Sequence, residues 1–263
     1  GLLRLNENKQ EFEHYNIKNG ITSVRNIQED VNGNIWVSVL NQGVYILDSK
    51  TVRLITKFEQ DTKDVHGLLS DFIRVMFLDS KGTLWLGDTR DNEYGLFKYL
   101  EDDNIFKSFQ YSTTDSLSLS SNEIRSLMED DLQRIWIGTD GGLNLYDHEA
   151  DVIYRNKRKF ILPSVGIRAK AGNDKMWVMA YSGGGLALVG PDINDVEMFG
   201  ENKGLLHNDV NDIILDDFGH LWLPTERGLS VFDTLTKTFS SYFENDGYQT
   251  SSHYIISSLK TKN

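Results

Sequence analysis

The sequence predicts an all-β fold made of repeated four-stranded antiparallel units, and three observations lead to this prediction. Tryptophan recurs five times in one frame, at positions 41 to 51 residues apart, in the contexts Gly33-Asn-Ile-Trp36-Val, Gly82-Thr-Leu-Trp85-Leu, Arg134-Ile-Trp136-Ile, Lys175-Met-Trp177-Val and Gly219-His-Leu-Trp222-Leu. Each tryptophan run is flanked by further short apolar runs, which turns containing Asp and Gly separate. The 22 glycines and three prolines suit a chain with many hairpins. A repeat of about 40–50 residues with several strands in each copy is typical of a β-propeller.

Each copy is predicted to contribute four consecutive strands, which together form one propeller blade. The first strand recurs at Val24-Arg25, Ile73-Arg74, Ile124-Arg125, Ile167-Arg168 and Val210-Asn211. An acidic hairpin, such as Asp79 to Gly82, leads into the tryptophan strand. A glycine and an apolar residue open the third strand, and a more variable fourth run follows, as at 237–243. The tryptophans are expected to be core residues between neighbouring blades rather than ligand contacts.

The repeat predicts how the chain is divided. Residues 20–250 are expected to form five whole blades. Residues 1–19 contain two strand-like runs but no tryptophan strand, and are expected to be the outer strands of a partial blade. Residues 251–263 resemble the first strand of a further, truncated blade. We therefore expect the chain to be a piece of a longer polypeptide.

Composition excludes several classes of function. The net charge of −12 argues against nucleic acid as a partner and against docking on an anionic membrane surface. The absence of cysteine removes disulfides, thiolate metal sites and cysteine nucleophiles. No run approaches the roughly 20 apolar residues of a membrane span, and no signal peptide pattern is present.

One repeat carries a family resemblance. The stretch Asp216-Asp-Phe-Gly-His-Leu-Trp222-Leu-Pro-Thr-Glu-Arg-Gly228-Leu-Ser-Val-Phe-Asp233 resembles the two-component regulator propeller repeat, and degenerate copies cover nearly the whole chain. Some copies depart from the pattern. Gln133-Arg134 replaces the hairpin glycine, Tyr181 to Gly185 replaces the usual loop, and the loop from Asp88 to Tyr94 carries three extra residues.

The resemblance implies a fold context and a function. Such repeats are characteristic of sensor regions of hybrid two-component systems in polysaccharide-degrading Gram-negative bacteria. In that family two seven-bladed propellers lie in the periplasm, followed by a β-sandwich, one membrane helix and a cytoplasmic histidine kinase. By resemblance this chain is most of the second propeller of a periplasmic, inner-membrane-anchored sensor that is a homodimer in full length. Its expected partners are an oligosaccharide ligand and the remainder of the same polypeptide, with no catalytic residue or cofactor in this segment.

The candidate ligand-binding residues lie in loops that share one face of a propeller. Loops between second and third strands, and segments that enter each first strand, surround the central channel, where these folds usually bind ligands. Polar groups beside an aromatic ring suit sugar recognition. The alternative is that these loops are ordinary solvated hairpin tips. The candidates are Asn41, Gln42, Arg90, Tyr94, Asp140, Tyr181, His207, Glu226 and Arg227.

Four arginines recur at one position of the innermost strand and form a second candidate group. Together they could ring the channel mouth, where their guanidinium groups would suit the carboxylate or sulfate of an acidic glycan. The alternative, which regular repetition favours, is that they pair with blade carboxylates such as Glu29, Asp79 or Glu129 and hold blades together. The four are Arg25, Arg74, Arg125 and Arg168.

No motif predicts a metal or phosphate site. Residues 30–34 lack the ligand spacing and terminal Glu of a calcium loop and are expected to be a hairpin turn. Gly183 to Gly185 joins two strands and opens no helix, so it is not a phosphate loop. The six histidines show no paired metal-ligand spacing, although His207 stands where a first strand begins.

Two other functions stay open from the sequence. The chain could be a protein-interaction platform. It could also be a propeller lyase resembling the streptogramin lyases, which would need a histidine base and metal-binding acids converging at the channel. The sequence shows no convincing set of such residues.

Overall fold

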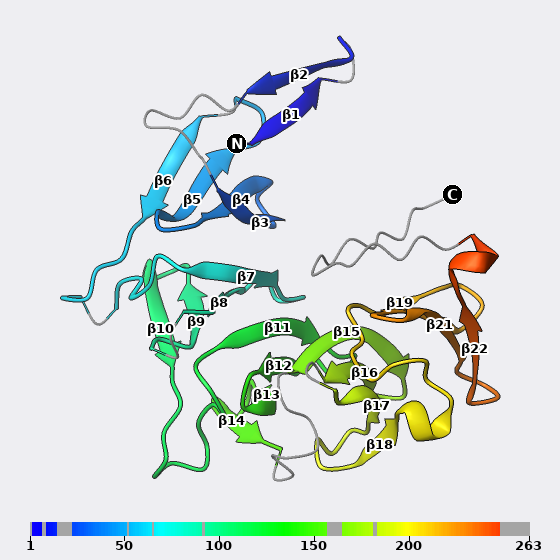
Figure 1. The fold of residues 1–263 in the computed structure, drawn as a ribbon. Coiled ribbons are helices and arrows are strands. Elements are labelled where there is room, and N and C mark those ends of the chain that lie inside the picture. The colour runs from blue at the N-terminus through cyan, green and yellow to red at the C-terminus, as the bar shows by residue number, and fades with distance from the viewer. Residues whose placement is uncertain are drawn as a thin grey trace. The chain divides into compact units, whose positions relative to one another are not determined.

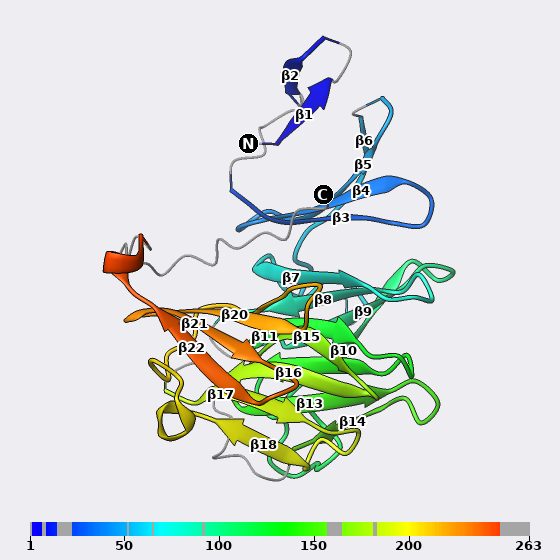
Figure 2. The same cartoon turned by 90° about the vertical axis from the view of Figure 1, so that its right-hand side faces the viewer.

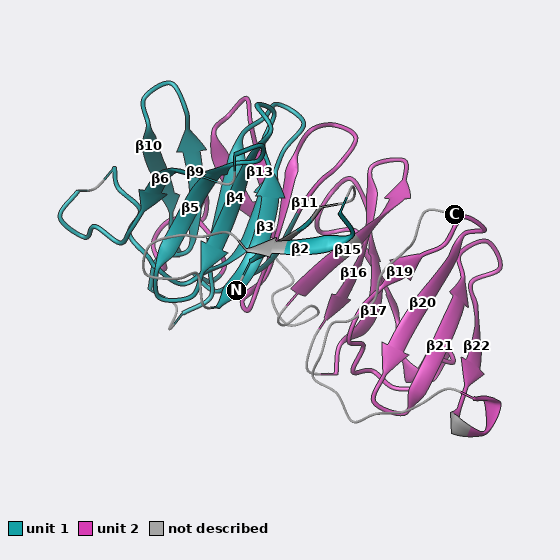
Figure 3. Cartoon of the chain, turned by 90° about the horizontal axis from the view of Figure 1, so that it is seen from above, with its two compact units in different colours: residues 1–111, 121–127 teal, residues 112–120, 128–263 magenta. Residues whose placement is uncertain are grey.

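The computed structural model describes residues 2–6, 9–14, 23–51, 53–64, 66–90, 93–156, 165–180 and 183–247. Their regular secondary structure is β-strand apart from two short 3₁₀ helices, η1 (Glu201–Lys203) and η2 (Glu244–Asp246). No helix of the described residues has the length and apolar character needed to cross a membrane. The chain forms two compact units: unit 1 comprises residues 1–111 and 121–127, and unit 2 comprises residues 112–120 and 128–263 (Figure 3).

Unit 1 begins with a two-stranded antiparallel sheet, in which Leu3 lies opposite His14. Two four-stranded antiparallel sheets follow, and within each the strands are adjacent in chain order (Figure 1). The strands are β1 (Leu3–Asn6), β2 (Glu11–His14), β3 (Val24–Glu29), β4 (Asn34–Val39), β5 (Gly43–Asp48), β6 (Leu54–Phe58), β7 (Ile73–Leu78), β8 (Leu84–Asp88), β9 (Leu96–Leu100) and β10 (Ile105–Phe109).

Three more four-stranded sheets have the same meander order (Figure 2). Their strands are β11 (Ile124–Glu129), β12 (Ile135–Thr139), β13 (Gly142–Asp147), β14 (Val152–Arg155), β15 (Val165–Gly172), β16 (Lys175–Ala180), β17 (Gly185–Val189), β18 (Val196–Phe199), β19 (Ile214–Leu215), β20 (His220–Thr225), β21 (Gly228–Asp233) and β22 (Thr238–Tyr242). The described residues thus contain the five four-stranded units that the tryptophan repeat predicts. We name each blade by its tryptophan, so that β7–β10 is the Trp85 blade. The strand expected within residues 251–263 lies outside the described residues.

The innermost strand of the Trp222 blade differs from its prediction. It was expected at Val210-Asn211, but Val210 forms only an isolated bridge with Thr225, and β19 begins at Ile214. Pro224 of the neighbouring strand has no N–H to donate, so it can only accept, and it does so from the N–H of Asn211 at 2.9 Å. The carboxylate of Asp212 accepts the N–H of Ile213 at 2.9 Å, which takes a further donor out of the ladder.

The tryptophans are core residues in four blades and exposed in the fifth. The exposed fractions are 4% for Trp36, 0% for Trp85 and Trp136, and 3% for Trp177, against 36% for Trp222. Burying an aromatic side chain of this size stabilises the fold by about 4–6 kcal/mol before opposing terms, an upper figure. The expectation that these residues form the core is confirmed for the four buried ones.

A carboxylate fixes the tryptophan in four of the five blades. The aspartate six residues before the tryptophan accepts the indole N–H through Oδ2, at 2.9 Å for Asp30, 2.9 Å for Asp79, 2.7 Å for Asp130 and 2.9 Å for Asp216. We call this arrangement the Asp–Trp latch. The other oxygen, Oδ1, accepts backbone N–H groups of the hairpin that follows. The acidic hairpins of the sequence therefore position the core tryptophan, and the Trp177 blade, which has Ala171 at that position, lacks the latch.

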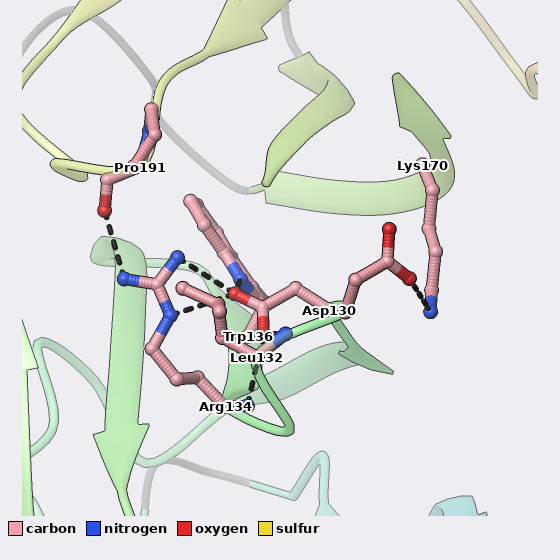
Figure 4. Close-up of polar contacts among 7 residues, drawn as sticks. Asp130, Leu132, Arg134, Trp136, Lys170 and Pro191 are labelled. Carbon is pink, nitrogen blue, oxygen red and sulfur yellow. Dashed lines mark hydrogen bonds and ion pairs between the residues drawn. The ribbon is translucent and has the colours of Figure 1, made fainter. Parts of the chain in front are cut away.

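Figure 4 shows the latch of the Trp136 blade, where Gln133 stands at the position of the hairpin glycine of other copies and Arg134 follows it. Arg134 donates through Nε to Asp130 Oδ2 at 2.7 Å and through Nη1 to the carbonyl of Pro191 at 2.9 Å. In the Trp222 blade, burial favours the neutral form of Asp216. The hydrogen bonds from Trp222 and from the backbone of His220 and Phe218 outweigh that effect and hold the pKa of Asp216 well below its ordinary value.

Candidate functional site

Unit 1 brings two of the predicted ligand-binding residues to one polar cluster, which we call the Gln60 cluster. The amide of Gln60 donates to the carbonyl of Leu69 at 2.8 Å and to the hydroxyl of Tyr94 at 3.4 Å. Its backbone N–H donates to Asp71 Oδ1 at 2.6 Å. The guanidinium of Arg90 lies 4.1 Å from the centre of the Phe72 ring. Tyr94 and Arg90 therefore each contact the segment that leads into β7, at Gln60 and at Phe72.

The turn that holds Asn41 and Gln42 approaches the same cluster. Gly43, which has φ +77°, passes so close that an added Cβ would lie 3.1 Å from Asp71 Oδ1. Asn41 occupies a left-handed turn position with φ 60°. Gln42 Oε1 accepts the hydroxyl proton of Tyr45 at 3.0 Å, which orients the amide. Both candidates thus sit on a hairpin tip whose glycine permits close contact with Asp71.

Asp88 is the most unusual group of the Gln60 cluster. Its side chain is fully buried, Oδ1 accepts the N–H of Arg90 at 2.7 Å, and Oδ2 has no hydrogen-bond partner in the described structure. Burial raises the pKa of Asp88, and the charge of Glu93 adds to this. Hydrogen bonds from the Arg90 backbone and the Ser70 hydroxyl offset it only in part.

Two of the four other blades carry threonine at the position of Asp88, and the remaining two carry Val39 and Ala180. Thr139 and Thr225 each end a tryptophan strand, and their hydroxyls donate to the carbonyls of Gly142 and Gly228 at 2.9 and 2.8 Å. An ionised carboxylate cannot make that donation. Sequence analysis placed Asp88 in a candidate loop but did not single it out, although its departure from threonine was visible by aligning the repeats.

Unit 2 brings together two further candidates, with one residue that the sequence analysis missed. His207, Asp209 and Glu226 each place a ligand atom within 4.8 Å of the others. The N–H of Asp209 donates to His207 Nδ1 at 3.2 Å, and Asp209 Oδ2 lies 3.7 Å from the same nitrogen. We call these three residues the His207 triad. They were not predicted as a metal site because His207 and Glu226 are far apart in sequence.

The other candidates in unit 2 do not converge on the triad through a described hydrogen bond or ion pair. Arg227 is exposed, and its backbone N–H donates to Thr225 Oγ1 at 3.3 Å. Asp140 is half-buried in the turn between β12 and β13. Tyr181 lies outside the described residues.

The proposed arginine ring is seen only in part. Arg25 and Arg74 are exposed on β3 and β7, and Arg125 pairs with Glu123 at 3.0 Å. The Arg168 side chain lies outside the described part of the structure. Asp79, one of the carboxylates suggested as a partner, instead accepts the indole proton of Trp85 and two backbone protons. The ring stays a prediction.

Two segments of the chain, residues 67–90 and 118–141, match the family model of the two component regulator propeller. The chain carries two-component regulator propeller repeats. Each matched segment contains a complete Asp–Trp latch, formed by Asp79 and Trp85 in the first and by Asp130 and Trp136 in the second. Both matched segments therefore include the residues that fix the core tryptophan.

Similar proteins agree on the fold. The chain is 24% identical over 246 residues to Histidine kinase P4 of Formosa agariphila, an alignment that covers 87% of this chain and 17% of the kinase. The extracellular domain of BT3049 from B. thetaiotaomicron, described as a hybrid two component system, superimposes with a TM-score of 0.68 at 22% identity. That match covers 85% of this chain and 30% of the domain.

A third solved structure has a different described activity. Virginiamycin B lyase from Staphylococcus aureus, a catalytically inactive variant with quinupristin, matches with a TM-score of 0.63 at 14% identity, over 87% of this chain and 72% of the lyase. These structural likenesses show that the two-component regulator propeller repeats adopt a β-propeller fold. The chain spans less than a third of the length of the kinase and of the BT3049 domain.

Proposed function

We propose that this chain is a ligand-sensing propeller of a hybrid two-component signalling protein. In this proposal it lies in the periplasm, as part of an inner-membrane-anchored polypeptide, and detects or transmits the binding of an oligosaccharide to a C-terminal histidine kinase. The observation that carries the proposal is the presence of two-component regulator propeller repeats in a chain that aligns over 87% of its length with a histidine kinase.

The Gln60 cluster supports an oligosaccharide as the ligand. It combines the Tyr94 and Phe72 rings with an amide, a carboxylate and a guanidinium group within one unit. Sugars expose many hydroxyls, which pair with amides and carboxylates, and their flat faces pack against aromatic rings. Arg90 would pair with a carboxylate or sulfate, so an acidic glycan fits this cluster better than a neutral one.

The ligand would act by shifting the equilibrium between two arrangements of the full-length sensor. If the full-length sensor is a homodimer with two arrangements, a glycan changes kinase output only as far as it binds one arrangement more tightly. A binding site at the loop face therefore has to be coupled to a change elsewhere in the polypeptide. This chain supplies the recognition part of that scheme.

The experiment is calorimetric titration of the chain with neutral, uronic-acid-containing and sulfated oligosaccharides. We expect binding of an acidic glycan, weakened at least about tenfold by Arg90→Ala, because a charge-assisted hydrogen bond contributes about 1.5–3 kcal/mol. The matched control is Arg53→Ala, an exposed arginine in the turn between β5 and β6. Equal affinities for the wild type and Arg90→Ala would show that the site lies elsewhere. Cleavage of the ligand would favour a lyase instead.

A further inference from the structure

We propose that the His207 triad binds one divalent transition-metal ion of the Zn²⁺ class. The ligands would be His207 and Asp209, from the segment before β19, and Glu226, from the turn between β20 and β21, all in unit 2. This site depends neither on the oligosaccharide nor on a kinase.

The atoms that converge in the His207 triad are of a kind that binds metal ions. The Asp209 N–H donates to His207 Nδ1 at 3.2 Å, so that nitrogen carries no proton in the metal-free chain, and an ion bound there would replace this hydrogen bond. His207 Nδ1 lies 3.7 Å from Asp209 Oδ2, and His207, Asp209 and Glu226 each offer a ligand atom within 4.8 Å of the others. One imidazole and two carboxylates therefore converge on a common space. A metal ion is what such a set of lone pairs binds.

The negative charge of the His207 triad is not balanced by a described ion pair with lysine or arginine. Among the described residues, no lysine or arginine pairs with Asp209 or Glu226, and the neighbouring Arg227 makes its described hydrogen bond through its backbone. Glu197, elsewhere in unit 2, shows the contrast, because Lys237 lies 2.7 Å from it and Lys203 lies 4.0 Å away. Two carboxylates held together without a cation repel each other, and a divalent ion relieves that repulsion.

Hydrogen bonds of the backbone hold both loops of the His207 triad in place. The N–H of Leu206 donates to Ser230 Oγ at 3.1 Å, and the N–H of Asn208 donates to Glu201 Oε1 at 3.0 Å. The turn that carries Glu226 is closed by Thr225, whose hydroxyl donates to the Gly228 carbonyl at 2.8 Å. The ligands thus sit on loops that are already positioned, and only side-chain rotation is needed to close the site.

Geometry and ligand chemistry select the class of metal. Bonds of about 2.0–2.2 Å in a tetrahedral site place ligand atoms about 3.3–3.6 Å apart, close to the 3.7 Å between His207 Nδ1 and Asp209 Oδ2. An imidazole with two carboxylates suits Zn²⁺ and similar ions, whereas Ca²⁺ and Mg²⁺ prefer oxygen ligands alone. Three protein ligands leave a position open for water or for an oxygen of a bound molecule.

The test is a competition titration of the tag-free chain, stripped with a chelator, against a chromogenic Zn²⁺ indicator at pH 7.5. We expect one Zn²⁺ per chain and a rise in melting temperature with Zn²⁺ concentration, because the ion binds the folded state. Glu226→Gln should weaken binding by more than about 10–100-fold, which is the loss already seen when a residue that only hydrogen-bonds to a metal ligand is changed. His207→Gln should do the same.

The controls separate this site from general surface binding. His66→Gln and Glu149→Gln change an exposed histidine and an exposed glutamate far from the triad in sequence, and should leave Zn²⁺ affinity unchanged. Glu226 is itself exposed, so Glu226→Gln is expected to fold even where His207→Gln does not. Equal Zn²⁺ affinity in Glu226→Gln and the wild type would overturn the proposal. Tighter binding of Ca²⁺ than of Zn²⁺ would overturn it too.

Discussion

At the scale of single residues, one carboxylate does two tasks in the Asp–Trp latch. Oδ2 accepts the indole proton of a core tryptophan, and Oδ1 accepts the hairpin N–H groups that would otherwise lack partners. A buried indole N–H needs such an acceptor, since leaving it unpaired costs about 1–3 kcal/mol. The repeat is recognisable in sequence because the fold needs both residues in every blade that uses the latch.

The tryptophans provide a matched pair for a stability measurement. Trp136→Ala and Trp222→Ala both remove an indole that bonds to a latch aspartate, but Trp136 is fully buried and Trp222 is 36% exposed. We expect Trp136→Ala to cost about 3–5 kcal/mol and Trp222→Ala distinctly less, because the cavity left by Trp136 is closed to water. Denaturant unfolding measures both. Equal losses of stability would mean that the closed cavity left by Trp136 adds nothing to the destabilisation.

Asp88 predicts an unusual dependence of stability on pH. A carboxyl whose pKa is raised on folding contributes most below its unfolded pKa near 3.8, and that contribution declines as pH rises through its folded pKa. Asp88→Asn keeps an acceptor at Oδ1 and cannot ionise. It should therefore be more stable than the wild type at pH 7 by about 1–3 kcal/mol, with the gain shrinking toward pH 3.5.

The control for Asp88→Asn is Asp71→Asn. In the wild type the Asp71 carboxylate already has a partner, because it accepts the Gln60 N–H. This variant should show no gain at pH 7. Thermal melts of the three proteins across pH 3.5 to 7 supply the comparison. A destabilised Asp88→Asn at pH 7 would mean that the ionised carboxylate has a favourable partner.

At the scale of elements, Arg155 fixes a long connection. Its Nε donates to the carbonyl of Ser118 at 2.6 Å, and its Nη2 donates to the carbonyls of Ser112 and Asp115 at 2.6 and 2.5 Å. The segment from 112 to 118 is therefore held to the last strand of the Trp136 blade by one guanidinium group. No other common side chain offers several donors in a planar fork.

Replacing that fork should loosen the connection without unfolding the blade. Arg155→Lys keeps the charge but cannot reach three carbonyls in the same geometry. We expect limited proteolysis to cleave within 112–118 at least about tenfold faster in Arg155→Lys, with a similar circular dichroism spectrum. Arg53→Lys, on an exposed turn, is the control. Unchanged cleavage would mean that the segment is held by other contacts.

Much of the element pattern could be predicted from sequence because tryptophan spacing and turn chemistry repeat. The late start of β19 could not, since it depends on the opposite strand, where Pro224 withholds a donor, and on the side chain of Asp212. The sequence pattern of a first strand does not show which residues of the second strand lie opposite. Pro224 was the residue in the sequence that could have indicated the late start of β19.

At the scale of the whole molecule, the binding surface was predictable only as a set of loops. Arg90 and Tyr94 could be placed in one loop from sequence, but the contacts of Tyr94 with Gln60 and of Arg90 with the Phe72 ring depend on how the chain packs in three dimensions. Asp209 was missed because the triad joins two loops that are separated along the chain by β19 and β20. A site whose residues come from two different loops cannot be predicted from the spacing of residues within one loop.

In the proposed function, this chain makes a kinase respond to an oligosaccharide. The most direct measurement is autophosphorylation of the natural full-length polypeptide, reconstituted in vesicles, against the concentration of an acidic oligosaccharide that the chain binds. We expect a saturable change in phosphorylation, with a midpoint at least about tenfold higher in Arg90→Ala. Phosphorylation that does not depend on the glycan, or a midpoint that Arg90→Ala leaves unchanged, would contradict it.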